Sequence, residues 1–242
     1  MEKFAEHIKK EESGQFSWQD FDYSKKYSDE FYEDYINSFV PNPGRRTGYR
    51  VVKRLLDILA ALFGLILLSP IMLVVAIAIK CESKGPIIFK QKRVGQGGKV
   101  FNCYKFRSMK VTAPSECATS VLENPEFHLT KVGKVIRKLS LDELPQLWCV
   151  LMGTMSVIGY RPLILSEVKC NEMRRKLGVF VAKPGISGSA QVVGRDDVYY
   201  KNKAMLDAEY VKTATIGKDI KLLFQTFMVV FQKKGNHDTK VK

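Results

Sequence analysis

Two adjacent carboxylates, Asp142 and Glu143, are the residues of this 242-residue sequence that are best placed for chemistry. They precede an apolar repeat at helical spacing, which predicts a buried helix ending near Gly153. The repeat consists of Leu144, Leu147, Trp148 and Leu151. Ser140 and Glu143 fit a capping box, whereas Pro145 prefers the first helical position, so the start of the helix stays open. Both versions place Asp142 at a helix N-terminus, where the macrodipole favours the ionised form that a nucleophilic carboxylate needs.

Two arginines flank this stretch and change how the carboxylates are interpreted. A Ser-x-x-Glu capping signal before an apolar run carries no catalytic meaning by itself. Arg137 lies just upstream of Asp142, however, and Arg161 follows the predicted helix. Two guanidinium groups that converge on a carboxylate pair would bind a pyrophosphate bidentately, while the carboxylates supply a nucleophile and a metal ligand. Adjacent side chains on a helix diverge by about 100°, so the two carboxylates can take separate roles.

An uncharged stretch over residues 58–79 predicts a membrane element. It has the length, about 20 residues, of a helix that spans a bilayer. Ser69-Pro70 falls near its middle, where proline removes a backbone hydrogen bond and kinks a helix. The flanks are basic on both sides: Arg45, Arg46, Arg50, Lys53 and Arg54 before it, and Lys80, Lys84, Lys90, Lys92 and Arg93 after it. Because basic flanks stay cytoplasmic, we predict a re-entrant helix with a break at Ser69 and Pro70 rather than a simple span.

Composition narrows the class of partner. The chain carries 39 Lys and Arg against 25 Asp and Glu, a net charge of +14, although residues 1–43 hold ten acids and five bases. The remainder is strongly basic and suits polyanions: nucleic acid, anionic lipid or phosphorylated small molecules. Charge alone does not choose among them. The five cysteines are odd in number and form no CxxC pair, which indicates reduced thiols in a cytosol-facing protein rather than zinc or redox chemistry.

The sequence divides into four parts. Residues 1–44 are an acidic, aromatic extension that ends in a Pro/Gly linker and lacks the regions of a signal peptide; it either docks a partner or is a partly helical extension, which we prefer. Residues 45–84 form the re-entrant helix and 85–216 the compact cytosolic core. Residues 217–242 form an amphipathic helix and a basic tail. That helix either docks on the core or lies in the lipid interface.

The core and the membrane element carry further local signals. Residues 87–94 and 99–106 read as two strands joined across Gly95 to Gly98, whose glycines indicate a turn and not a nucleotide cradle. Asp57, at the start of the uncharged stretch, is spaced to form an ion pair with Arg54. Together these patterns predict a mainly helical α+β protein, with a compact cytosolic domain on an N-terminal re-entrant helix-break-helix.

Several segments resemble, in order along the chain, the bacterial sugar transferase family, the small monotopic polyprenyl-phosphate phosphoglycosyl transferases. The resemblance covers about residues 50–235 and includes the Ser69-Pro70 break. Its segments are 85–109 (GPIIFKQKRVGQGGKVFNCYKFRSM), 137–148, Arg161-Pro162 and 183–195, the last from Lys183-Pro184-Gly185 to Gly194-Arg195. An ordered set of segments is far more specific than any single motif.

The resemblance implies a two-step transfer on the cytoplasmic face of the bacterial inner membrane. Asp142 matches the family's nucleophile; it would attack the sugar-bearing phosphate of a UDP-sugar, release UMP and hold the phosphosugar covalently until polyprenyl (undecaprenyl) phosphate accepts it. Glu143 matches the second member of the family's Asp-Glu dyad, and Mg²⁺ would bind this pair. Such a transfer would initiate a cell-surface polysaccharide or glycoconjugate pathway, such as that of a capsule or an exopolysaccharide.

Six basic residues are candidate phosphate ligands: Arg137 and Arg161 by the resemblance, Lys105 and Arg107 from a basic patch, and Lys183 and Arg195 beside a Gly-rich loop. The patch alternates with Tyr104 and Phe106, a pattern that could also stack the bases of single-stranded nucleic acid or simply follow a strand. The loop could close over the substrate or be a turn without substrate contact.

The expected partners are a UDP-sugar, polyprenyl phosphate and membrane lipid, without nucleic acid, and a homo-oligomer stays open. Two other functions compete with this interpretation. The first is a membrane-anchored scaffold that binds anionic lipid or nucleic acid without catalysis. The second is a glycosyltransferase that transfers the sugar without its phosphate and so releases UDP.

Overall fold

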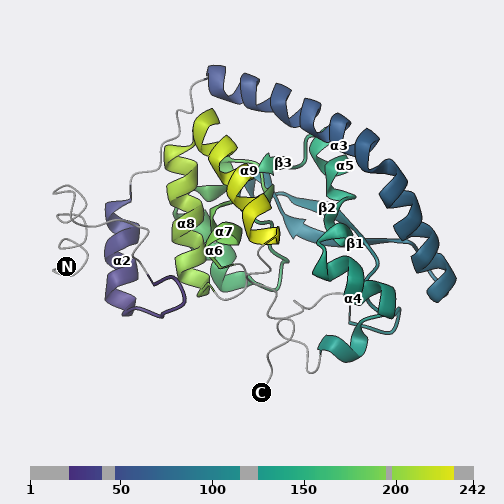
Figure 1. Ribbon diagram of the computed structural model, residues 1–242. Helices are drawn as coiled ribbons and strands as arrows, with labels where there is room; N and C mark the ends of the chain where they lie inside the picture. The colour runs from purple at the N-terminus through teal and green to yellow at the C-terminus, as the bar shows by residue number, and fades with distance from the viewer. Residues whose placement is uncertain (1–21, 40–46, 115–124, 195–197, 232–242) are drawn as a thin grey trace.

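The computed structural model describes residues 22–39, 47–114, 125–194 and 198–231 (Figure 1). Within them, helices dominate and accompany two small two-stranded sheets, so the predicted mainly helical α+β class is confirmed. The helices are α2 (Asp29–Ser38), α3 (Thr47–Glu82), α4 (Lys131–Lys138), α5 (Gln146–Leu151), α6 (Val168–Lys176), α7 (Ser189–Val193), α8 (Tyr200–Thr213) and α9 (Ile216–Phe231). The strands are β1 (Ile88–Val94), β2 (Val100–Phe106), β3 (Ser156–Ile158) and β4 (Gly185–Ser187).

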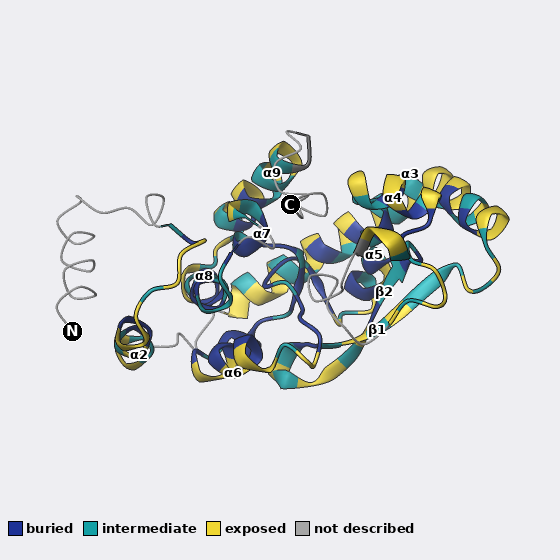
Figure 2. Ribbon diagram, turned by 90° about the horizontal axis from the view of Figure 1, so that it is seen from below, coloured by how far each residue is buried: buried dark blue, intermediate teal, exposed yellow. Residues whose placement is uncertain are grey.

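Helix α3 is continuous through Pro70, where the sequence predicts a break. Proline cannot donate to the carbonyl four residues earlier, which is that of Ile66. The Ser69 hydroxyl donates to this Ile66 carbonyl at 2.8 Å and replaces the missing bond. The helix therefore changes direction along its length instead of breaking (Figure 1). By length and composition α3 is able to cross a membrane, and most of its apolar side chains are exposed (Figure 2).

The N-terminal part of α3 is bound to the body of the protein by two charged side chains. Arg54 donates to the Val150 and Leu151 carbonyls at the end of α5, at 2.6 and 2.8 Å. Asp57, which is buried, accepts hydrogen bonds from the Ser156 hydroxyl and the Val157 amide. The predicted Arg54–Asp57 ion pair is therefore wrong, because each side chain satisfies backbone groups of the neighbouring α5–β3 segment instead.

The C-terminal end of α3 is bound to the same body. Arg107, just after β2, donates to the carbonyls of Ser83 and Lys84, directly after the helix, at 2.8 and 3.0 Å, and to the Ile79 carbonyl in its last turn at 3.4 Å. Glu82 accepts hydrogen bonds from the first two amides of α4. Since both ends of α3 bind one body, the apolar middle lies along that body rather than projecting from it (Figure 1).

One of the two sheets could be predicted from the sequence and the other could not. Strands β1 and β2 form the predicted antiparallel hairpin, with Ile88 opposite Phe106 and Val94 opposite Val100. Its turn places Gly97 and Gly98 at φ of 68° and 72°, where residues with a side chain are strained. Strands β3 and β4 pair in parallel, and three-residue strands carry too little periodicity for the sequence to reveal them.

The main apolar core lies between α6, α8 and the segments around them, where Figure 2 shows largely buried helices. Helix α2 belongs to this core, which confirms that the acidic extension is partly helical. The Tyr32 hydroxyl donates to Asn202 at 2.8 Å and the Tyr35 hydroxyl to Glu209 at 2.9 Å, both on α8. The alternative, that residues 1–43 dock a partner, stays a prediction, because residues 1–21 and 40–46 lie outside the described residues.

A fully buried ion pair joins α6 to α8. The side chains of Arg174 and Asp207 are 0% and 1% exposed and bind each other directly. Burial by itself lowers the pKa of Arg174, but Asp207 outweighs this effect and raises it. Removing one partner of such a pair leaves an uncompensated buried charge.

We therefore expect Asp207→Asn to lower the free energy of unfolding by about 3–5 kcal/mol, measured by urea unfolding of the detergent-solubilised protein. The control is Asp29→Asn, because Asp29 forms an exposed ion pair with Lys201, and exposed pairs contribute about 0–1 kcal/mol. Equal losses in the two variants would contradict a stabilising role of the buried pair.

Candidate active site

The carboxylates Asp142 and Glu143 lie in a short 3-10 turn, Leu141–Glu143, that precedes α5. Ser140, just before the turn, adopts a left-handed conformation with φ of 55°, and its side chain makes no capping hydrogen bond. The capping box is therefore wrong. Pro145 directly precedes α5, so the carboxylates stand outside the first turn of that helix.

Glu143 binds two cations through one oxygen. Its Oε1 atom lies 2.7 Å from Lys105 Nζ and 2.9 Å from Arg161 NH2. Burial by itself raises the pKa of Glu143, but Arg161 and Lys105 outweigh it and hold that pKa well below the ordinary value of 4.5. This ion triad joins strand β2, the 3-10 turn and the segment after β3, which are distant in sequence.

Asp142 has a different environment although it is adjacent. It is 8% exposed, and no hydrogen bond to its carboxylate occurs within the part of the chain that the structure describes. Burial raises the pKa of Asp142 and Glu143 raises it further, while Lys105, Arg137 and Arg161 lower it. The two carboxylates therefore have different surroundings, with opposite pKa shifts. The prediction that the position of Asp142 favours its ionised form is wrong, because burial raises the pKa of this carboxyl.

Arg161 is held in place through its own backbone. The fully buried Arg174 donates to the Arg161 carbonyl at 2.9 Å. Arg93 on β1 donates to the next carbonyl, that of Pro162, and the Val94 amide donates to the Leu163 carbonyl at 3.0 Å. The cation that reaches Glu143 is therefore fixed by α6 on one side and by the hairpin on the other.

Two cavities meet at Asp142. One, of about 350 Å³, is lined by both carboxylates and by side chains from α3 and α9; we call it the helix-side cavity. The other, of about 200 Å³, lies against the hairpin and the segment that follows β2; we call it the hairpin-side cavity. Lys105, Arg137 and Asp142 line both. A carboxylate among cations is thus reachable from two directions.

Helices α3 and α9 contribute apolar side chains to the helix-side cavity. Gly64 and Leu68 of α3 line it, as do Leu223 and Phe227 of α9. Gly64 packs closely on α5, because a Cβ atom there would lie 3.1 Å from Leu147 Cδ1. The amphipathic C-terminal helix therefore docks against the site, which decides one of the two uses left open by its sequence.

The structure brings three of the six predicted phosphate ligands together with the two carboxylates, and places two of the others elsewhere. Lys105, Arg137, Asp142, Glu143 and Arg161 line the helix-side cavity. Arg107 lines the hairpin-side cavity, but its NH1 and NH2 groups donate to the end of α3. Lys183 lines a separate cavity beside the start of α3. Arg195 lies outside the described residues.

Sequence reasoning missed three polar residues of the helix-side cavity: Ser187, Gln191 and Thr226. The Ser187 and Thr226 hydroxyls lie 2.7 Å apart and join β4 to α9. Gln191 Oε1 is buried without a hydrogen-bond partner among the described residues. The Gly-rich loop of the sequence contained a signal for the first two. Thr226 could not be predicted, because the sequence pattern of its helix, α9, indicates only an apolar face.

Among the described residues, Asp142 and Glu143 offer the best fit to a divalent metal. Groups of three or more potential ligand side chains are absent from the described residues. Mg²⁺, however, is commonly bound by one or two carboxylates together with substrate phosphates and water. Both carboxylates line one cavity, and the ion pairs of Glu143 use Oε1 alone. The donor set therefore fits a metal that a phosphorylated ligand helps to hold.

These features define a class of protein: a mainly helical α+β protein with an exposed apolar helix that borders a carboxylate site surrounded by cations. Comparison with known proteins gives its family. The model of the bacterial sugar transferase family matches residues 48–233. The chain belongs to the bacterial sugar transferase family.

Several curated relatives share this region. The chain is similar to an undecaprenyl-phosphate galactose phosphotransferase of Salmonella typhimurium, with 39% identity over 77% of the chain and 42% of the relative. It is also similar to a UDP-glucose:undecaprenyl-phosphate glucose-1-phosphate transferase of Klebsiella pneumoniae, with 42% identity over 76% and 41%. The chain thus spans about two fifths of these relatives. The exopolysaccharide production protein ExoY of Rhizobium meliloti is 33% identical over 77% of the chain and 88% of the relative.

The depressed pKa of Glu143 predicts a pH dependence of stability. A carboxylate whose folded-state pKa is lowered stabilises the fold above its unfolded-state pKa, and this contribution is lost as the pH falls through the folded-state value. We expect wild type to exceed Glu143→Gln in unfolding free energy by a constant amount above about pH 5 and by less as the pH falls further. The measurement is urea unfolding at several pH values without divalent ions. Glu172→Gln, at an exposed site on α6, controls for the lost charge, and a gap that widens in acid would contradict the assignment.

Proposed function

We propose that this protein transfers a sugar 1-phosphate from a UDP-sugar to polyprenyl phosphate and releases UMP. The observation that carries this proposal is the carboxylate of Asp142, which accepts no hydrogen bond from the described residues and lines both cavities with Lys105 and Arg137. A nucleophile between two openings suits a reaction in which the first product leaves before the second substrate binds.

In the first step, a carboxylate oxygen of Asp142 attacks the phosphorus that carries the sugar. An acyl phosphate bond forms, and the bond from that phosphorus to the bridging oxygen breaks, so UMP leaves with the electron pair. Lys105, Arg137 and Arg161 favour the ionised carboxylate and neutralise charge on the phosphates. In the second step, a phosphate oxygen of the lipid attacks the same phosphorus, and the carboxylate of Asp142 is regenerated.

Glu143 acts in this proposal as the residue that positions the cations, because its Oε1 atom holds Lys105 and Arg161 on one side of the site. Asp142 and Glu143 would also hold Mg²⁺. When bound, the metal supplies electrostatic stabilisation of charge on the transferred phosphate.

The acceptor approaches from the membrane in this proposal. The helix-side cavity has apolar walls from α3 and α9, which suit the chain of a lipid phosphate. Both ends of α3 bind the cytosolic body, which supports a helix that enters and leaves on the cytoplasmic face. The names of these two relatives share undecaprenyl phosphate but differ in the sugar, galactose or glucose. They therefore support one lipid acceptor but do not select the sugar.

The reaction predicts which nucleotide is released. Detergent-solubilised protein with Mg²⁺, polyprenyl phosphate and a panel of UDP-galactose, UDP-glucose and UDP-N-acetylgalactosamine should release UMP with at least one donor. Asp142→Asn keeps the shape of the side chain but removes the nucleophile, so UMP release should fall by at least about 10³-fold. Without acceptor, wild type alone should gain the mass of a phosphosugar.

Asp29→Asn, at the exposed start of α2, is the control for this loss of a carboxylate and should release UMP at the wild-type rate. UDP as the product would show that the sugar moves without its phosphate. UMP release that persists in Asp142→Asn would contradict the covalent step, and no release by wild type with any donor would favour the scaffold.

The membrane arrangement can be tested at the two ends of α3. Cys81 is exposed near the C-terminal end, and Gly48 has open space around it at the N-terminal end. In a background without the other cysteines, we expect neither Cys81 nor Gly48→Cys to react with a membrane-impermeant thiol reagent in intact cells, whereas both should react after lysis. Labelling of one end alone from outside would show that α3 crosses the membrane.

A further inference from the structure

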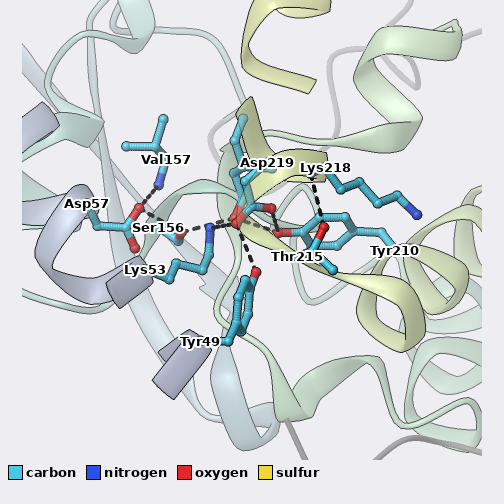
Figure 3. Close-up of polar contacts among 10 residues, drawn as sticks. Tyr49, Lys53, Asp57, Ser156, Val157, Tyr210, Thr215, Lys218 and Asp219 are labelled. Atoms are coloured by element: carbon cyan, nitrogen blue, oxygen red, sulfur yellow. Dashed lines mark hydrogen bonds and ion pairs between the residues drawn. The ribbon is translucent and has the colours of Figure 1, made fainter. Parts of the chain in front are cut away.

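A third cavity, of about 550 Å³, lies beside the first turns of α3, away from Asp142. Its charged lining consists of four cations, Arg50, Lys53, Arg54 and Lys183, and one carboxylate, Asp57. We call it the Lys183 cavity. Figure 3 shows part of its wall, in which Lys53, Asp57 and Ser156 lie near the start of α9. The mechanism proposed above uses none of these side chains.

Two of the four cations already have partners. Lys53 donates to Asp219 of α9 at 2.8 Å, and the Tyr49 and Tyr210 hydroxyls donate to the same carboxylate (Figure 3). Arg54 donates to the carbonyls at the end of α5. These bonds fix the wall of the cavity. Because Asp219 already accepts these hydrogen bonds, it does not neutralise the other two cations, Arg50 and Lys183.

Lys183 and Arg50 have no ion pair or hydrogen bond with any residue that the structure describes. The Lys183 and Arg54 cations converge on one point, because a Cβ atom added to Gly153 would lie 3.6 Å from Lys183 Nζ and 3.3 Å from Arg54 NH2. Burial lowers the pKa of Lys183, and Arg54 and Arg50 lower it further against the opposite effect of Asp57. An anion in the cavity would relieve this repulsion.

The lining is also partly apolar, and its place along α3 is informative. Val51 and Val181 line the cavity and are 63% and 50% exposed. The cavity takes its α3 residues from Thr47 to Asp57, just before the uncharged stretch begins. If α3 lies in the bilayer, this is the level of the lipid headgroups, where basic side chains meet anionic phosphate.

We propose that the Lys183 cavity binds the phosphate group of an anionic membrane phospholipid, with Arg50 and Lys183 as its ligands and the apolar wall against the acyl chains. Such a lipid would complete the attachment of the first turns of α3. The proposal does not rest on the transfer reaction, since it concerns residues and a ligand that the reaction does not use. It assigns Lys183 a ligand other than the substrate phosphate that the sequence predicts for this residue.

The test is binding of short-chain phosphatidylglycerol to the full chain in an uncharged detergent, followed by native mass spectrometry. Short-chain phosphatidylcholine and inorganic phosphate are the comparison ligands. We expect wild type to bind phosphatidylglycerol most tightly. Arg50→Gln with Lys183→Gln should weaken this binding about thirty-fold, from the contribution of two basic side chains near anionic lipid.

Three variants separate the site from general charge and from catalysis. Lys169→Gln with Lys176→Gln removes two exposed cations from α6 and should bind like wild type. Lys183→Arg keeps the charge and should retain binding even if the double variant folds poorly, which thermal unfolding would report. Asp142→Asn should bind phosphatidylglycerol normally whether or not the transfer reaction is correct.

The outcomes are distinct. Equal affinity for phosphatidylglycerol in wild type and in a folded Arg50→Gln, Lys183→Gln double variant would overturn the site. Inorganic phosphate that binds as tightly as phosphatidylglycerol, and is lost with the same two side chains, would overturn the lipid as the occupant. Phosphatidylcholine that binds as tightly would show that the acyl chains alone are recognised and would overturn the phosphate contact.

Discussion

The structure depends on one constraint: an apolar helix must be fixed at both ends to a polar body while its middle stays exposed. Arg54 and Asp57 fix the first part of α3 to the α5–β3 segment, and Arg107 and Glu82 fix its end to the hairpin and to α4. The middle, with Gly64 and Leu68, then borders the carboxylate site. The site lies beside the apolar helix because these polar attachments determine how α3 crosses the body.

A series of contacts between charged residues connects α8 to the carboxylate site. Asp207 holds Arg174, which donates to the backbone of Arg161, whose side chain in turn binds Glu143. The Arg174–Asp207 pair is fully buried, where an unpaired charge is costly, so these two side chains have few alternative positions. Asp142 is the exception in this series. Its carboxylate is buried among cations without a hydrogen bond from the described residues, and reactive groups are commonly left in such incompletely satisfied surroundings.

Much of this arrangement could be predicted from local sequence, and the remainder could not for physical reasons. The hairpin follows from alternation and glycines, and the grouping of Arg137, Asp142, Glu143 and Arg161 from residue types around one apolar repeat. The left-handed conformation of Ser140 could not be predicted, because Ser140 and Glu143 have the spacing of a capping box. The types of Arg107 and Lys183 suit phosphate ligands. In the folded protein, however, Arg107 donates to carbonyls at and just after the end of α3, and Lys183 lines a different cavity. The continuity of α3 through Pro70 was also not predicted; there the Ser69 hydroxyl supplies the bond to the Ile66 carbonyl that proline cannot make.

The side chains that attach α3 have a consequence for the conditions under which the orientation of the helix persists. Arg54 and Arg107 donate to neutral backbone carbonyls rather than to carboxylates. A guanidinium keeps its proton at every physiological pH, and a carbonyl has no proton to gain. Bonds between a fixed charge and a dipole at short range are also screened less by salt than pairs of exposed ions. These two attachments of α3 therefore do not depend on the charge of a carboxylate, unlike those made by Asp57 and Glu82.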